Sequence, residues 1–223
     1  MSVEVDLLDR FAVRIDGLPV ADAAWTRRDA AAVVKVLGLA EGRRLHREQL
    51  IDLLWPELDV EDAGPRLHKA AHYARRAMGR RDAVVLRDEM VSLLPGETVD
   101  IDAIGFEREA RAALDSGRAV AAEQVLDRYG ATLLPTDLYA DWVAETRERL
   151  DELRLELLRQ ARRWREVLDR IRSTSTLMSR SCASSRRPVT RVPRCGSSNG
   201  WTARCVVSST WPRVPRWRGS GSS

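Results

Sequence analysis

Cationic and hydrogen-bonding side chains recur at helical spacing in residues 64–78, which read GPRLHKAAHYARRAM. At 100° per residue the larger apolar side chains and two alanines share one narrow stripe: Leu67, Ala71, Ala74 and Met78. The opposite face carries a polar set without any acid: Arg66, Lys69, His72, Tyr73 and Arg76. Arg and Lys reach guanine edges or phosphates, and His and Tyr reach backbone oxygens, so this face could bind DNA. On an isolated helix a solvated basic face would be the simpler interpretation.

Paired arginines lie around this segment. Arg27 and Arg28 open an earlier helical pattern, Arg43 and Arg44 follow it, and Arg80 and Arg81 come directly after residue 78. Such pairs suit phosphate contacts that position a protein on DNA without reading its sequence, but solubility explains them equally well. Arg87 lies in a predicted turn, where it could enter a minor groove or simply face the solvent.

The sequence lacks the patterns of common catalytic sites. There is no Gly-rich phosphate loop, no G-x-S-x-G, and no pair of carboxylates among apolar neighbours, so we expect neither an enzyme nor a cofactor. His68 and His72 have the i, i+4 spacing of a zinc pair, but no Glu lies between them and no third ligand is evident. We therefore predict no metal site, and we interpret the larger aromatic residues as structural: Trp55, Tyr129, Tyr139 and Trp142.

The elements that must position the basic face follow from periodicity. Residues 2–20 alternate as short strands, and helical spacing follows over residues 25–39 and 47–54, with Leu50, Leu53 and Leu54 facing inward. His46 precedes the second of these helices as a cap or surface residue. A third helix starts at about Glu61 or Gly64 and ends at Met78. The segment AVVLRDEMVSLLPG at 83–96 reads as a hairpin, so the order predicts an α+β winged helix-turn-helix domain over residues 1–98.

From residue 99 to residue 168 the pattern is helical throughout. Gly117 and Gly130 separate helices, and a long helix runs from about Asp141 to Leu168. Antiparallel helix pairs with Gly at their turns predict an all-α tetratricopeptide-like domain that is truncated near residue 168. Because the neighbouring repeats would be missing, we expect Leu153 and Leu157 to be exposed.

The composition changes abruptly after Asp169, beyond which the chain contains no Asp or Glu. Residues 170–223 hold 11 Arg, and subtracting them from the net charge of +4 leaves −7 for residues 1–169. Trp and Cys codons begin with TG, so a two-base shift of the reading frame turns each of them into a codon with a central T, which encodes an apolar residue. When GC-rich codons are chosen for the tail and shifted in this way, the new reading contains acids and an amphipathic helical repeat. We therefore interpret residues 169–223 as a disordered, out-of-frame tail, because such a segment cannot offset the entropy cost of ordering.

The cysteines, the start of the chain and the lengths of its apolar runs bear on the cellular location of the protein. Every cysteine lies in the tail, at Cys182, Cys195 and Cys205, so the predicted domains need no disulfide. The start of the chain is charged and lacks the apolar core of a signal peptide, and no apolar run approaches membrane-spanning length. We expect a cytoplasmic protein without a membrane partner.

Residues 2–168 resemble SARP-like bacterial transcriptional regulators. The segments LLDRFAVRIDGLPV, HREQLIDLLWPE and PRLHKAAHYARRAMG resemble their OmpR-type winged-helix domain, and LLPTDLYADW resembles the bacterial transcriptional activator domain that follows it. The resemblance implies that the third helix enters the major groove of double-stranded DNA, usually at direct repeats. It also implies that the helical domain supports contacts with RNA polymerase or a homodimer.

Three functions remain open at this point. The first is a DNA-binding transcriptional regulator, most simply an activator, that reads the major groove with the helix at 64–78. The second is a protein-interaction scaffold that acts through the helical repeats, and the third is a truncated regulator without function. No receiver domain precedes the winged-helix pattern, so control by phosphorelay within this chain is not expected.

Overall fold

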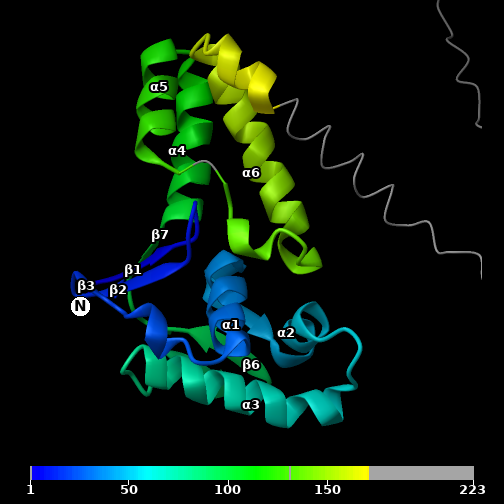
Figure 1. Cartoon of the computed structure of the whole chain (residues 1–223). Helices are drawn as coiled ribbons and strands as arrows, with labels where there is room; N and C mark the ends of the chain where they lie inside the picture. Colours follow the sequence, from blue (N-terminus) through cyan, green and yellow to red (C-terminus); the bar gives the residue numbers. More distant parts are fainter. Residues whose placement is uncertain (1, 131, 171–223) are drawn as a thin grey trace, which may run out of the picture. The chain divides into compact units, whose positions relative to one another are not determined.

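The computed structural model describes residues 2–130 and 132–170 (Figure 1). Within them a mixed α+β region comes first and a helical region follows. The predicted out-of-frame tail lies outside the described residues, apart from Asp169 and Arg170. In the part of the chain that the structure describes, no helix is long and apolar enough to cross a membrane.

The first sheet has the strand order β3-β2-β1-β7. Its strands are β1 (Val3–Asp6), β2 (Ala12–Ile15), β3 (Leu18–Pro19) and β7 (Val99–Ile101). Val5 of β1 lies opposite Val13 in the antiparallel pairing with β2 and opposite Ile101 in the parallel pairing with β7. Because side chains alternate along a strand, the valines of β1 enter the core while its acids point to the other face.

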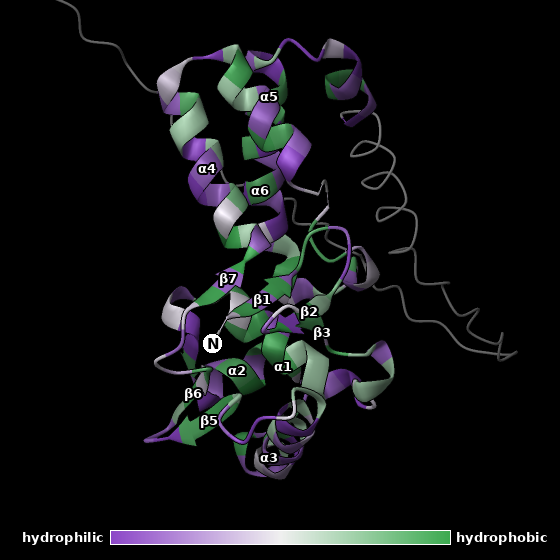
Figure 2. Cartoon of the chain, turned by 90° about the vertical axis from the view of Figure 1, so that its left-hand side faces the viewer, coloured by the Kyte–Doolittle hydropathy of each residue, from purple (hydrophilic) through white to green (hydrophobic). Residues whose placement is uncertain are grey.

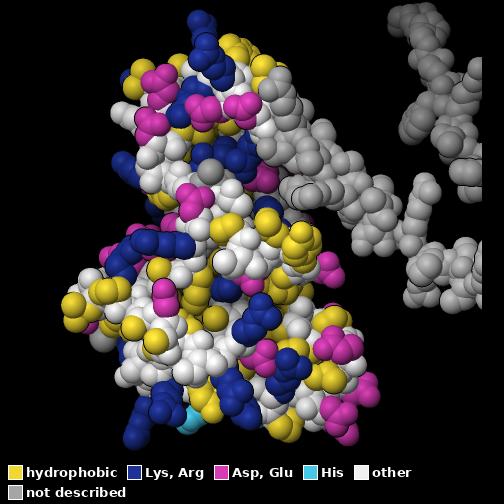
Figure 3. All heavy atoms as spheres, in the orientation of Figure 1, with side chains coloured by type: hydrophobic (Ala, Val, Ile, Leu, Met, Phe, Trp, Pro, Cys, Tyr) yellow, Lys and Arg dark blue, Asp and Glu magenta, His cyan; other side chains and the backbone are white. Residues whose placement is uncertain are grey.

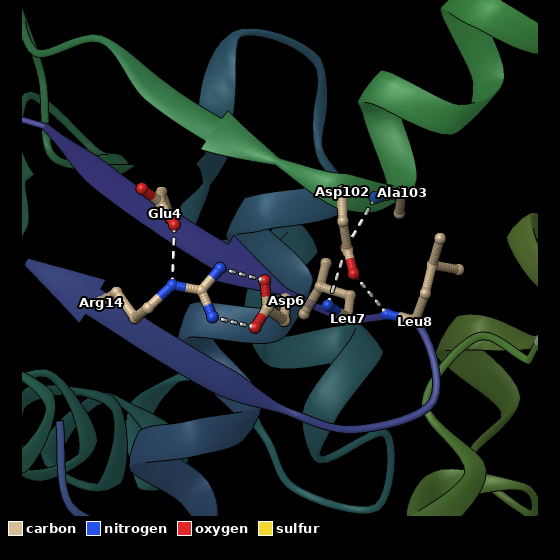
Figure 4. A network of polar contacts seen from close by, with 7 residues as sticks. All are labelled: Glu4, Asp6, Leu7, Leu8, Arg14, Asp102 and Ala103. Carbon is tan, nitrogen blue, oxygen red and sulfur yellow. Dashed lines mark hydrogen bonds and ion pairs between the residues drawn. The ribbon is translucent and has the colours of Figure 1, made fainter. Parts of the chain in front are cut away.

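On that other face Arg14 of β2 pairs with both acids of β1. Arg14 Nε lies 2.7 Å from Glu4 Oε2, and Arg14 Nη1 lies 2.7 Å from Asp6 Oδ2 (Figure 4). Cross-strand pairs of opposite charge favour one register over its neighbours. The sequence alternation and the ion pairs therefore select the same register for the β1–β2 hairpin.

The remaining elements of the α+β region are a second sheet of order β4-β6-β5 and three helices. The strands are β4 (Arg44–His46), β5 (Val84–Arg87) and β6 (Met90–Leu93), and the helices are α1 (Arg28–Leu39), α2 (Arg47–Leu54) and α3 (Val60–Ala77). Short 3₁₀ turns at Asp22–Ala24 and Glu41–Arg43 flank α1. α1 is among the most apolar helices (Figure 2), and it packs against α2, α3 and β6. Its buried residues Val33, Val34 and Leu37 therefore lie at the centre of this region's core.

Local sequence explains how these elements begin and turn. Asp88 and Glu89 both adopt positive φ, at 51° and 62°, in the two-residue turn between β5 and β6. Such a turn matches the twist of the paired strands. His46 caps α2: its Nδ1 accepts a hydrogen bond from the Glu48 backbone N–H at 3.4 Å, while its own N–H donates to Gln49 Oε1 at 3.3 Å. The sequence interpretation of His46 as a cap is confirmed.

The helical region contains α4 (Asp102–Ser116), α5 (Ala119–Arg128) and α6 (Asp141–Gln160), followed by a short helical segment at 164–170. Gly117 ends α4 with φ of 65°, a conformation that L side chains adopt only with strain. α4, α5 and α6 pack against one another around Phe106 and Leu157. A 3₁₀ turn at Pro135–Asp137 lies in the connection between α5 and α6.

Buried Arg154 holds the end of α5 against α6. Its guanidinium donates to the carbonyl oxygens of Tyr129 and Gly130 and lies 5.2 Å from the centre of the Phe106 ring. Burial lowers the pKa of Arg154 to about 10, yet the group stays charged at neutral pH. A buried cation of this kind is stable only because the carbonyl oxygens replace its water.

Asp102 joins the first sheet to the helical region. Its carboxylate accepts hydrogen bonds from the backbone N–H groups of Leu7 (2.7 Å), Leu8 (2.9 Å) and Ala103 (2.6 Å), as Figure 4 shows. It thus satisfies donors beyond the end of β1 and at the first turn of α4, where a negative charge is also favoured by the helix dipole. One side chain therefore fixes where the strand ends and where the helix begins.

A second connection runs through the segment between α5 and α6. Lys35 of α1 is buried, and its Nζ lies 2.6 Å from Asp137 Oδ2 and 4.9 Å from the centre of the Phe11 ring. Arg147 of α6 donates to carbonyl oxygens of the same segment, those of Leu133, Leu134, Asp137 and Leu138. The α5–α6 connection is therefore held both by α1 and by α6.

The structure differs from the predicted elements at two strands. Arg44–His46 forms β4, which pairs antiparallel with β6, although the sequence predicts no strand there. Val99–Ile101 forms β7 and pairs in parallel with β1, although the sequence predicts the helical domain from residue 99. Both strands are only three residues long, so periodicity is too weak to reveal them, and their partners are distant in the sequence.

Other predictions about the helices are wrong. The long helix ends at Gln160, and Arg162 has φ of 58° in the turn before residues 164–170. This second helical segment folds back, so that Arg170 pairs with Asp151 of α6. Leu157 is fully buried and Leu153 is half-buried, although both were predicted to be exposed. Leu53 is exposed and Ile51 takes its inward place, while Tyr139, which we interpreted as structural, is 95% exposed.

The Asp102 carboxyl should make stability depend on pH. Burial raises its pKa to about 6, although the N–H donors oppose that rise, from an ordinary value of 3.8. Because the folded-state pKa is the higher one, this group favours folding most at low pH, and the contribution is lost as pH rises through 6. Relative to Asp102→Asn, the wild-type free energy of unfolding should fall by about 2 kcal/mol between about pH 4 and 7. Urea unfolding of both proteins across this range measures the difference, and a constant difference would contradict the assignment.

Candidate nucleic-acid interface

The apolar stripe predicted for the third helix is confirmed as the buried face of α3. Leu67, Ala71, Ala74 and Met78 are all buried, together with Ala63 and Ala70. This face packs against α1, α2 and β5. Small alanines let the helices approach closely, and they fix which side chains of α3 remain outside.

The outer face of α3 carries Lys69, His72 and Arg76, which are all exposed. These residues are spaced by three or four positions, so they lie along one side of the helix. The acids of α3, Glu61 and Asp62, are confined to its first turn. Figure 3 shows Lys and Arg side chains with a His along the lower edge of the molecule, where α3 lies. The arrangement offers hydrogen-bond donors and positive charge, which suit a polyanion.

A concave site adjoins the C-terminal half of this face. It has a volume of about 530 Å³ and is lined by Ala23, Ala24, Thr26, Arg27, Tyr73 and Arg76. The Arg27 guanidinium carbon lies 5.4 Å from the centre of the Tyr73 ring, which in turn meets His72 edge to face at 5.5 Å. Arg27, predicted from the sequence as a phosphate contact, is thus brought next to Tyr73 and Arg76 although it is far from them in the sequence.

The β5–β6 hairpin borders the other half of the face. A smaller hollow of about 220 Å³ lies between α3 and the hairpin, and His68 and Arg87 are among its lining residues. The Arg87 side chain is 84% exposed and its Nε lies 3.9 Å from Asp88 Oδ2. Arg47 at the start of α2 holds the turn: its Nε lies 3.0 Å from Glu89 Oε2, and its backbone N–H donates to the Glu89 carbonyl at 2.8 Å. The hairpin tip is therefore tied to α2.

His68 is exposed on the same side of α3 as His72, but the sequence was interpreted only for its possible role as a metal ligand. The i, i+4 spacing of His68 and His72 also indicates that His68 shares the outer face. Among residues 2–130 and 132–170, no group of His, Cys, Asp and Glu side chains is arranged to hold a metal ion.

Arg66 is directed partly into the protein. Its Nε donates to Asp29 Oδ2 of α1 at 2.8 Å and its Nη2 to Asp29 Oδ1 at 3.3 Å, while its guanidinium carbon lies 4.8 Å from the centre of the Trp55 ring. The hydrogen bonds to Asp29 raise the pKa of Arg66 above its ordinary value. Asp29 could not be linked to Arg66 from the sequence, because the two residues are 37 positions apart.

Arg80 has partners within the chain as well. Its Nη2 lies 2.5 Å from Asp82 Oδ2 and 3.0 Å from Glu97 Oε1, and its side chain is only 12% exposed. The same hydrogen bonds raise the pKa of Arg80 and lower that of Asp82. Arg81 and Arg28, in contrast, are exposed. Arg43 donates through Nη2 to the Glu97 carbonyl oxygen at 2.7 Å, and neither Arg43 nor Arg44 lines the two hollows beside α3.

Replacing Arg80 by Ala should lower stability without weakening DNA binding. The change removes ion pairs that connect the end of α3 with the segment before β7, and we expect a loss of about 1–2 kcal/mol. Arg81→Ala is the matched control for the stability measurement alone, because it removes the same charge from an exposed neighbouring position and should leave stability within about 0.5 kcal/mol. Thermal unfolding measures the first effect, and fluorescence anisotropy with duplex DNA measures the second. Loss of binding by the folded Arg80 variant would show that Arg80 contacts DNA.

The comparisons with known proteins give no family for this chain. No family model matches the sequence, and no curated protein matches it either. The geometry of α3 and its surroundings therefore carries the functional argument.

Proposed function

We propose that this chain is a DNA-binding transcriptional regulator whose N-terminal region is a winged helix-turn-helix. In this proposal α2 and α3 form the helix-turn-helix, α3 is the recognition helix, and the β5–β6 hairpin is the wing. The observation that carries it is the exposed face of Lys69, His72 and Arg76, which has no acid within residues 64–78 although residues 1–169 carry a net charge of −7.

The dimensions of α3 fit the major groove of B-DNA. Its 18 residues span about 27 Å, and the major groove of B-DNA is about 12 Å wide and admits a single α-helix. Lys69 and Arg76 can donate to guanine edges or phosphates, and His72 lies between them on the same side. Arg27, Arg28 and Arg81 would contact phosphates around the groove, and Arg87 at the wing tip would approach the neighbouring minor groove.

The same proposal assigns the chain to the SARP-like regulators. Support comes from the sequence resemblance over residues 2–168 and from the order of elements, an α+β region with a hairpin followed by packed helices. The helical region would then be a bacterial transcriptional activator domain of tetratricopeptide-like helices. Its partners would be RNA polymerase or a second copy of the chain on direct repeats, in the bacterial cytoplasm.

A protein-interaction scaffold is the second candidate. Exposed apolar side chains on the helical region favour it: Val120, Trp164 and Leu168. Deleting residues 1–98 would not separate the two candidates, because it removes β1, with which β7 pairs, and the backbone donors that Asp102 requires. Point substitutions on α3 in the full chain avoid this damage.

Binding to duplex DNA tests the proposed function directly. A labelled duplex from the DNA upstream of the gene and a scrambled duplex of the same length are titrated with the full chain in an anisotropy assay. We expect tighter binding to the first duplex, and an affinity that falls steeply between about 50 and 200 mM salt because counterions are released. Equal affinity for both duplexes, or no binding at low salt, would overturn the proposal.

A further inference from the structure

Arg66 connects α3 to the first turn of α1 and to the C-terminal end of α2. It lies on α3, its guanidinium forms paired hydrogen bonds with Asp29 in the first turn of α1, and it stacks over Trp55 at the end of α2. Trp55 is buried, so the platform beneath the guanidinium is fixed. Arg is suited to this geometry because its planar group can pair with a carboxylate and stack on a ring at the same time.

We propose that Arg66 is a positioning residue that sets the angle of α3 on α1 and α2, and that it does not contact DNA. This inference rests on the proposed function of α3 as the recognition helix. Asp29 neutralises the Arg66 charge and occupies the Nε–Nη2 edge of its guanidinium, which removes one of the edges that could bind a phosphate through paired hydrogen bonds. Arg66 therefore differs from Lys69 and Arg76, with which sequence periodicity groups it.

A change of helix angle at Arg66 has its largest effect on residues far along α3. Arg76 lies ten residues beyond Arg66, about 15 Å along the helix axis. A tilt of α3 by about 10° around Arg66 would move Arg76 by about 2.6 Å, which exceeds the tolerance of a hydrogen bond. Since Arg66 and Asp29 are both partly exposed, their pair adds little to global stability, and its effect should be on orientation.

The test compares Arg66→Ala, Arg66→Lys and Asp29→Ala in the full chain, with Arg118→Ala as a control for the loss of one exposed charge. For a positioning role we expect all three substitutions to weaken specific DNA binding about fivefold to tenfold, with the salt slope and the melting temperature nearly unchanged. Arg66→Lys should also weaken binding, because Lys keeps the positive charge but forms neither the paired hydrogen bonds with Asp29 nor the stack on Trp55. Arg118→Ala should bind as the wild type does.

A direct phosphate contact gives a different pattern. Arg66→Lys would then bind almost as the wild type does, Arg66→Ala would lower the salt slope by about 1, and Asp29→Ala would strengthen binding by removing a negative charge. Any of these results would overturn the inference.

Hydrogen exchange of α3 backbone amides separates this inference from the proposed function. The same three substitutions should speed exchange in residues 60–67 at least about threefold, while Arg118→Ala should not. This measurement needs no DNA. Unchanged exchange would overturn the positioning role even if the wild type binds DNA, and faster exchange in a protein that binds no DNA would leave only the proposed function rejected.

Discussion

Replacing Lys69, His72 and Arg76 together by Ala is expected to lower the affinity for specific DNA at least about 100-fold, since each contact to a base edge contributes about 1–3 kcal/mol of discrimination. The loss of the Lys69 and Arg76 charges should also make the plot of log affinity against log salt shallower by about 2. All three side chains are exposed and none of them belongs to the core, so the variant should fold normally. Circular dichroism checks the fold, and anisotropy titrations at several salt concentrations measure both effects.

The matched control is the double variant Arg118→Ala, Arg159→Ala. It removes the same number of positive charges from exposed positions of the helical region. If only the overall charge mattered, this control would lose as much affinity as the α3 variant. Wild-type affinity of the α3 variant for the specific duplex would exclude α3 as the recognition helix and would favour the scaffold.

Replacing Asp102 by Ala should produce the largest loss of stability. The substitution leaves the backbone N–H groups of Leu7 and Leu8 without their acceptor, in a place where neighbouring residues are buried. Hydrogen bonds to a charged acceptor contribute about 1.5–3 kcal/mol each, and unsatisfied buried donors add a penalty, so we expect a loss of about 2–4 kcal/mol. Denaturant unfolding at neutral pH measures it.

Asp100→Ala is the control for this change. Asp100 lies two residues earlier in β7 and is exposed, so its removal should change stability by less than about 0.5 kcal/mol. The effect of Asp102→Ala should also appear as faster hydrogen exchange at Leu7 and Leu8 and in the first turn of α4. A variant as stable as the wild type would show that the strand end and the helix start do not depend on this carboxylate.

Much of the α+β region was predictable because its signals are local. The buried stripe of α3 repeats at helical spacing, α2 runs from Arg47 to Leu54 as predicted, and the Asp88–Glu89 turn divides the two strands of the predicted hairpin. The polar face opposite that stripe followed from the same period. These features depend on residues within a few positions of one another, so sequence periodicity is sufficient to find them.

Tertiary structure decided which of the polar residues are available for a partner. Sequence periodicity groups Arg66 with Arg76 on the polar face of α3, and both are exposed, yet Arg66 pairs with Asp29 and stacks on Trp55. Arg80 and Arg81 are adjacent, yet only Arg80 is drawn toward Glu97. Arg27 was brought to Tyr73, and β7 was added to β1, across gaps that no local pattern spans. The sequence by itself determined α2, α3, the β5–β6 hairpin and the polar face of α3, because those follow from the spacing of nearby residues. Only the fold decided which charges are already neutralised, because an ion pair between distant residues depends on how the elements pack.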